Sequence, residues 1–136
     1  MKLFSVTALF LMFSTAAYAG EPLTGDIIDT HAQKIGTAEL KQTRHGALLT
    51  IDAKLPEGVH AMHIHEHAAC DAPEFNTAGG HLNPDKHTHG IESAKGRHAG
   101  DLPNLYVEST GHIKAEVFLG ERSKWPKQGA AIIIHE

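Results

Sequence analysis

Cysteine is almost absent from this 136-residue chain, which has only Cys70. One cysteine cannot close a disulfide bond within the chain. In an exported protein, an odd cysteine leaves three possibilities open: an intermolecular disulfide, a reduced thiol, or a missing partner.

Basic charge and long apolar runs are also scarce. The 12 Lys and Arg residues are outnumbered by 16 Asp and Glu residues, which gives a formal net charge of −4 at pH 7. This balance argues against nucleic acid as a partner. No segment is apolar over the roughly 20 residues that a membrane-spanning helix needs, and none carries a convincing helical stripe. The sequence therefore predicts neither a membrane protein nor a helical one.

The N-terminal stretch MKLFSVTALFLMFSTAAYA, residues 1–19, has the pattern of a secretory signal peptide. An early lysine precedes an apolar run at residues 6–13, and Ala17 and Ala19 form an A-x-A cleavage pattern. We expect cleavage after Ala19 and a periplasmic or secreted protein. Residues 20–136 then have the size of one domain.

Alternating apolar and polar residues indicate β-strands. In GALLTIDAKL, Leu49, Ile51 and Ala53 share one face of the predicted strand, and HIKAEVFL at residues 112–119 alternates in the same way. Turn signals rich in Gly and Pro separate these segments from others. The predicted class is all-β, with hairpins joining consecutive strands. Further strands are predicted at residues 34–44, 59–67, 104–110 and 130–136.

A long segment at residues 68–101 lacks this alternation and is rich in Gly, Asn, Pro, Asp and His. Irregular loops beyond roughly 15 residues are usually functional or disordered in compact domains. With few apolar side chains to pack, the loop needs another source of order. A metal ion is the natural candidate.

Histidines supply the ligands for such an ion. His63 and His65 lie two residues apart on a predicted strand, so they share a face, while Met62 and Ile64 point into the core. An H-x-H pair alone is a weak signal, because an exposed pair is more often simply solvated. The loop and the last strand add further donors, and imidazole with carboxylate suits zinc and copper. These donors are His81, His87, His89, His98, Asp101 and His135.

Four motifs in this order resemble the copper-zinc superoxide dismutases, particularly the exported bacterial members. They are GVHAMHIHE, AGGHLNP, HG followed by RHAGDLPNL, and the final IIIHE, and the resemblance runs over residues 35–136. It implies a Greek-key β-barrel or sandwich of immunoglobulin-like architecture, of which this family is itself a standard example.

The resemblance also implies a site and an activity. Superoxide would be converted to oxygen and hydrogen peroxide at a copper site, bridged to zinc through the imidazolate of His81. The implied copper ligands, which are also the catalytic residues, are His63, His65, His81 and His135. The implied zinc ligands are His81, His89, His98 and Asp101.

The remaining motif histidines are assigned differently. His60 lies on the opposite face from the copper pair and matches a structural family histidine that hydrogen-bonds backbone groups. His67 has no counterpart as a ligand, and we expect it to be solvated. His87 competes with His89 as a zinc ligand, but the family interval and the following Gly90 favour His89.

Family members continue past the last H-E motif, whereas this sequence ends at Glu136. The resemblance places a guiding arginine, an electrostatic loop, a final strand and the disulfide partner of Cys70 in that continuation. We therefore expect a shortened chain with reduced activity, an open sheet edge and a possible homodimer. Two other hypotheses remain: a periplasmic copper- and zinc-binding protein with little or no dismutase activity, and a structural β-domain with incidental histidines.

Overall fold

The structure is a computed structural model that describes residues 7–11, 21–120, 126 and 128–135. The regular elements of these residues are β-strands, apart from one 3-10 turn at Asn76–Ala78, and every ladder is antiparallel. The predicted all-β class is confirmed. Within the same residues, no helix has the length and apolar character needed to cross a membrane.

Two sheets contain all of these strands. The larger has seven strands in the order β6-β9-β1-β2-β3-β4-β8, and the smaller pairs β5 with β7. The bounds are β1 Thr7–Leu11, β2 Leu23–Ile28, β3 Lys34–Thr43, β4 Gly46–Lys54, β5 Gly58–His60, β6 Met62–His65, β7 Leu105–Val107, β8 His112–Leu119 and β9 Ala130–Ile134.

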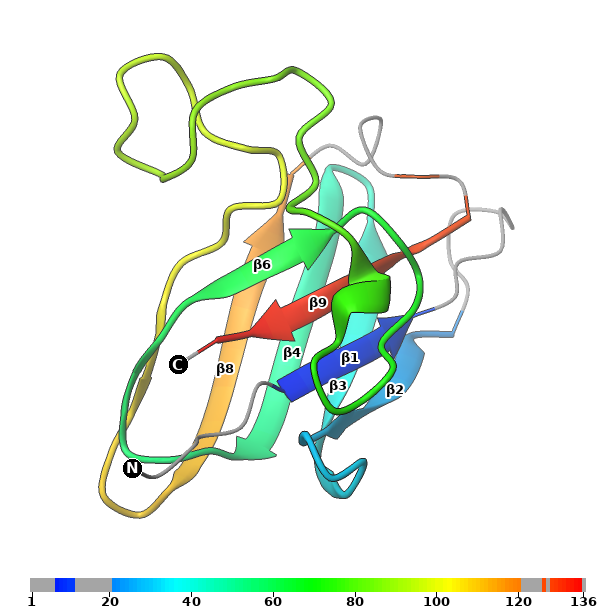
Figure 1. Cartoon of the computed structure of the whole chain (residues 1–136), viewed down its shortest axis with the longest axis vertical. Helices are drawn as coiled ribbons and strands as arrows, with labels where there is room; N and C mark the ends of the chain where they lie inside the picture. The colour runs from blue at the N-terminus through cyan, green and yellow to red at the C-terminus, as the bar shows by residue number, and fades with distance from the viewer. Residues whose placement is uncertain (1–6, 12–20, 121–125, 127, 136) are drawn as a thin grey trace.

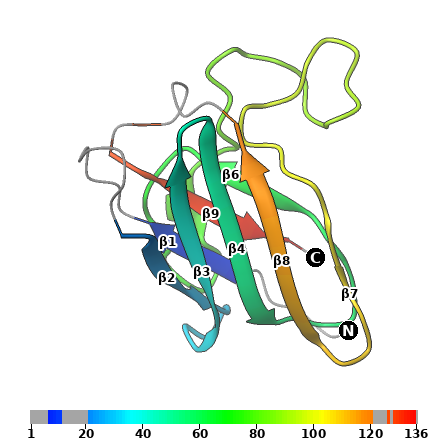
Figure 2. The same cartoon turned by 180° about the vertical axis from the view of Figure 1, so that it is seen from behind.

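The seven-stranded sheet folds over itself into a sandwich. In both views β6, β9 and β1 form one layer, which lies across β3, β4 and β8 in the other (Figures 1 and 2). The main core fills the space between the layers. Its fully buried members include Leu40 of β3, Leu49 and Ile51 of β4, and Met62 and Ile64 of β6.

Alternation along the long strands matches the sequence prediction. Leu49, Ile51 and Ala53 are all buried, as expected for one face of a half-buried strand. The expected hairpins are only partly present: β2, β3 and β4 pair in sequence order, but β4 next pairs with β8. Local alternation identifies a strand without identifying its neighbour, so this long-range pairing was not predictable from it.

The strand predicted at residues 59–67 is two strands. The chain leaves strand geometry at Ala61, so β5 pairs with β7 while β6 pairs with β9. The backbone N–H of His135 donates to the carbonyl oxygen of Ala61 at 2.7 Å. The break thus lets one continuous stretch of sequence contribute to both sheets.

Strands β1 and β2 were not predicted as strands. β1 falls inside the segment interpreted as a signal peptide, and it pairs with both β2 and β9. The expected cleavage position after Ala19 lies outside the described residues, as does Glu136. Removal of the leader therefore stays a prediction.

The long loop after β6 covers the outer face of β9. Phe75 and Ala78 of this loop pack with Ala131 and Ile133 in a second, smaller apolar cluster. The half-buried Cys70 packs against the same cluster. In Figure 1 the 3-10 turn of the loop lies in front of β9 and β1. Strand β9 is therefore buried on both faces, between the main core and the loop.

Candidate metal centre

Strand β6 is the platform of the site. As predicted, Met62 and Ile64 point into the main core and are at most 1% exposed. His63 and His65 alternate with them and are 8% and 7% exposed. Two imidazoles are thus held on one face of a buried strand, where packing limits their rotamers.

Two parts of the long loop return alongside β6. The N–H of Leu82 donates to the carbonyl oxygen of Ile64 at 2.8 Å, and the N–H of Ile64 donates to the carbonyl oxygen of Gly100 at 2.8 Å. Isolated bridges then set His81 beside His65, and Asp101 beside His63. The loop residues expected to bind metal therefore reach the strand histidines through backbone hydrogen bonds.

His135 arrives from the other side of β6. It directly follows β9, whose residues pair with those of β6 from Met62 to His65. One possible ligand atom from each of four imidazoles lies within 4.8 Å of the others. These four are the residues that the sequence resemblance assigned to copper: His63, His65, His81 and His135.

A second group combines imidazoles with a carboxylate. Ligand atoms of His63, His81, His89 and Asp101 also lie within 4.8 Å of one another. Asp101 Oδ1 is at its centre, 3.1 Å from His89 Nδ1 and 3.8 Å from His81 Nδ1. The expected zinc ligand His98 is not a member of this group, but its Nδ1 is 3.5 Å from the same carboxylate oxygen. His98 therefore lies at this second group, and the distances fit either His98 or His63 as its fourth ligand.

Buried polar atoms without hydrogen-bond partners test whether these residues fit a metal. Among the described residues six such side-chain atoms occur, and five lie in this cluster. Because buried polar atoms normally have partners, this concentration of unsatisfied lone pairs fits metal ligation. The five atoms are His63 Nδ1, His65 Nε2, His98 Nδ1, His135 Nε2 and Asp101 Oδ1.

The hydrogen bond of His65 shows how one ligand atom is prepared. Its Nδ1 donates to the carbonyl oxygen of Gly79 at 2.8 Å. A neutral ring protonated at Nδ1 presents the bare lone pair of Nε2. Fixing the tautomer through the far nitrogen is how proteins usually orient a metal-binding histidine.

Burial keeps the imidazoles neutral. It lowers the pKa of His63 to about 3, with repulsion from His81 and His135 adding to the effect. Burial likewise lowers the pKa of His81 to about 4, helped by His65 and His89. The pKa values of His65 and His135 are also lowered, first by burial. At neutral pH the rings therefore offer lone pairs without first losing protons.

Asp101 is kept ionised by its own loop. Burial acts to raise the pKa of this carboxyl, but the N–H groups of Gly90 and His98 donate to Oδ2 at 2.8 and 2.9 Å and hold the pKa below its usual value. Both donors contact Oδ2, so Oδ1 remains to face the histidines. The negative charge can therefore offset that of a bound cation.

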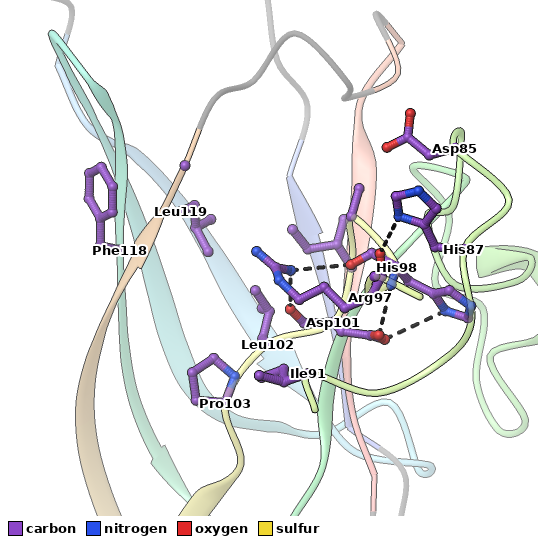
Figure 3. A pocket seen from close by; sticks show the side chains of 14 residues that line it. Asp85, His87, Ile91, Arg97, His98, Asp101, Leu102, Pro103, Phe118 and Leu119 are labelled. Carbon is purple, nitrogen blue, oxygen red and sulfur yellow. Dashed lines mark hydrogen bonds and ion pairs between the residues drawn. The ribbon is translucent and has the colours of Figure 1, made fainter. Parts of the chain in front are cut away.

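Arg97 was not singled out from the sequence. Its Nη1 donates to the carbonyl oxygen of Asp101 at 2.8 Å and to that of His98 at 3.2 Å, beside a pocket between the loop and the end of β8 (Figure 3). The arginine thus clamps the backbone of two expected zinc ligands. The motif RHAGDL contains this arginine. Because arginine is not a metal ligand, a search for metal donors does not identify it.

Three other histidines behave as the sequence suggested. His60 has its ring nitrogens 3.0 and 2.9 Å from the carbonyl oxygens of His135 and Pro56, so the expected backbone contacts are confirmed. His67 is exposed, as expected for a solvated side chain. His87 lies outside both groups, and its Nδ1 donates to the carbonyl oxygen of Arg97 at 3.1 Å.

Comparison with known proteins identifies the family. A family model described as copper/zinc superoxide dismutase matches residues 34–136. The chain belongs to the copper/zinc superoxide dismutase family. Two copper-zinc superoxide dismutases of Aquifex aeolicus (strain VF5) are 39% and 36% identical to it, over 81% and 98% of this chain and 71% and 85% of theirs.

A solved structure supports the same family. The superoxide dismutase-like protein from Bacillus subtilis is 32% identical and superposes with a TM-score of 0.76, covering 83% of this chain and 82% of that one. The sandwich fold and the resemblance to this family are therefore confirmed.

Proposed function

We propose that this chain is a superoxide dismutase that converts superoxide to oxygen and hydrogen peroxide. Copper is held by His63, His65, His81 and His135, and zinc by His81, His89, His98 and Asp101. The observation that carries the proposal is the convergence of buried, unsatisfied ligand atoms on one cluster. Bound copper would supply the one-electron chemistry, and the protein supplies binding, orientation and electrostatics.

The role of His81 as the shared ligand rests on its position. Its Nδ1 is 3.8 Å from Asp101 Oδ1, so a bridging imidazole would use its other nitrogen, Nε2, for copper. His63 also belongs to both groups, and its ring stacks on that of His81 with centroids 3.9 Å apart. We assign the bridge to His81 because the motif AGGHLNP matches the family there.

The chain's own residues give the site its shape and access. His63 and Asp101 close its inner side, with side chains 10% and 2% exposed. His81 and His89 are 24% and 55% exposed, so a small anion can reach the cluster from their side. Nε2 of His81 can hold a proton there for the peroxide product.

A second candidate function is metal binding with little or no dismutase activity. A relative from Bacillus subtilis (strain 168), 31% identical over 81% of this chain, is called a superoxide dismutase-like protein. The ligand cluster alone fits either function.

We further propose that the protein is exported, acts in the periplasm or outside the cell, and forms a homodimer.

Superoxide decay measured by pulse radiolysis on metal-loaded, metal-analysed protein separates the two functions. We expect catalytic decay with copper bound, its loss in His63→Ala, and its retention in His67→Ala, which removes an exposed imidazole outside both groups. Stoichiometric copper and zinc without catalytic decay would instead establish the metal-binding protein.

The same samples test the bridge through metal content. His81→Ala is expected to lower both copper and zinc, whereas His98→Ala lowers chiefly zinc, because removal of a ligand weakens its own site most. Equal copper loss in the two variants would argue against His81 as the shared ligand.

A further inference from the structure

Strand β1 connects two parts of the large sheet that have no ladder with each other. Its five residues run antiparallel to β9, from Thr7 opposite Ile134 to Leu11 opposite Ala130. On its other side, Ala8 and Leu9 pair with Ile28 and Ile27 of β2. In the strand order of the large sheet, β9 and β2 are each next to β1 and not next to one another. Both views show β1 between them (Figures 1 and 2).

The space that β1 occupies therefore has the features of a site for an extended peptide. Strands β2 and β9 run parallel to each other. Their facing edges offer backbone N–H and C=O groups to a strand that lies between them and is antiparallel to both. The occupant TALFL has no charge and no proline. Backbone pairing supplies the affinity when a strand is added to a sheet in this way.

We propose that the gap between β2 and β9 is a strand-acceptor site, and that the leader segment Thr7–Leu11 fills it in the unprocessed chain. The acceptor site takes an apolar, extended segment of about five residues. This proposal is independent of the proposed function, since it concerns backbone pairing and needs no metal.

Occupancy of the acceptor site also bears on the candidate metal centre. Strand β9 lies between β6 and β1, and His135 directly follows it. Without β1, β6 would be the one remaining ladder partner of β9 among the described strands. The filled site thus holds β9, and with it the backbone entering His135, from both sides.

The leader segment thus has two competing uses. Signal recognition acts on the unfolded chain, whereas Thr7–Leu11 is paired on both sides in the folded one, so export and the cleavage that follows it require β1 to leave the sheet. Cleavage then leaves the edges of β2 and β9 open, and open edges pair with other strands. Folding before export and processing are therefore expected to oppose one another.

Engineered cysteines test the register in the full 136-residue chain, produced without export. Ala8 and Ile28 are opposite one another, and directly opposed residues have Cβ atoms about 4.5–5.5 Å apart, close to the spacing that a disulfide needs. The matched control is Leu9→Cys with Ile28→Cys, because adjacent residues of a strand point to opposite faces. Both pairs carry Cys70→Ser, since Cys70 and Ile28 pack against the same apolar cluster.

We expect peptide mapping to find the disulfide in Ala8→Cys with Ile28→Cys at several times the yield of the control pair. No disulfide in either pair, or equal yields in both, would overturn the proposal.

Hydrogen exchange of the metal-free full chain gives a second, independent test. Leu9→Pro removes an N–H and is incompatible with a strand that is paired on both sides, whereas Leu9→Val keeps strand propensity. In the proline variant we expect amide exchange of Ala130–Ile134 to accelerate at least tenfold, with no change for the valine variant. The amides of Leu49 and Ile51 in β4 report whether the rest of the sheet has stayed folded.

Unchanged protection of β9 in Leu9→Pro would show that Thr7–Leu11 does not fill the site. If β4 loses its protection as well, the variant has unfolded, and the cysteine pairs decide the question.

Discussion

His63 and His81 carry the most strongly lowered pKa values of the imidazoles in the centre, about 3 and about 4, chiefly because they are buried. In the unfolded chain both rings return to a pKa of about 6.5. As the pH falls below that value, the unfolded state binds protons that the folded state does not. The free energy of unfolding of the metal-free protein must therefore decrease.

This difference predicts a pH dependence. Urea unfolding of the metal-free chain is expected to show a loss of about 2 kcal/mol or more between pH 7 and pH 4.5, since each unit of pKa difference corresponds to about 1.4 kcal/mol. Protonation of Asp101, whose pKa is also lowered, acts in the same direction at still lower pH.

The control is the double variant His63→Gln with His81→Gln, which removes both rings and is expected to flatten the profile. An equally steep loss in the double variant would assign the effect to other groups.

At the residue scale, the sequence predicted which side chains meet but not what orients them. The spacing of His63 and His65 predicted a shared face, and their place in the structure agrees. The carbonyl oxygen of Gly79 and the N–H of Gly90 orient His65 and Asp101. Every residue type has a backbone carbonyl and every type but proline has an N–H, so the sequence carries no direct signal for these contacts.

At the scale of elements, the long loop depends on close backbone packing against β6. A Cβ atom added at Gly100 would collide with the carbonyl oxygen of Ile64 and lie 3.1 Å from the Leu82 Cβ atom. Glycine is therefore required where the loop passes β6. The next residue is Asp101, so displacement at Gly100 moves the carboxylate away from the histidines.

Gly100→Ala is accordingly expected to lower the free energy of unfolding by about 1–3 kcal/mol, as overpacking usually does, and to reduce zinc content. The matched control is Gly120→Ala, because a Cβ atom at Gly120 meets nothing within 4 Å. Thermal unfolding and metal analysis of both variants measure the effect. Normal zinc content in Gly100→Ala would mean that the loop can move from β6 without losing the site.

Prediction of strands depended on how regular the alternation is. The strands β4 and β8 follow an uninterrupted period of two. Both of them, and β3, were predicted close to their observed bounds. Strand β2 was missed because LTGDII contains glycine and aspartate, which are depleted in strands. The break at Ala61 has no such marker, since it results from pairing with two different sheets.

At the scale of the whole molecule, two descriptions of the N-terminal apolar segment have to be reconciled. Its composition predicts a cleaved signal peptide, whereas the folded chain uses Thr7–Leu11 as a sheet strand between β2 and β9. Signal recognition acts on the unfolded chain and sheet pairing on the folded one. The sequence identified the first use because it is local, and missed the second because the pairing partner β9 lies more than one hundred residues away.

Removal of the leader is therefore expected to change the association state. A chain that begins at Gly20 has open edges on β2 and β9, and such edges pair with other molecules. Sedimentation velocity at increasing protein concentration should show association of this chain, while the full 136-residue chain associates less under the same conditions.

The variant Ile28→Lys in the shortened chain isolates the edge of β2, because a lysine on an exposed strand edge opposes intermolecular pairing. Ile28 lies opposite Ala8 in the full chain, so the substitution falls where the acceptor site opens. We expect it to reduce association toward the level of the full chain. If the shortened chain is monomeric without this lysine, the edges of β2 and β9 close on each other or are covered in another way, and Thr7–Leu11 is dispensable for closing the sheet.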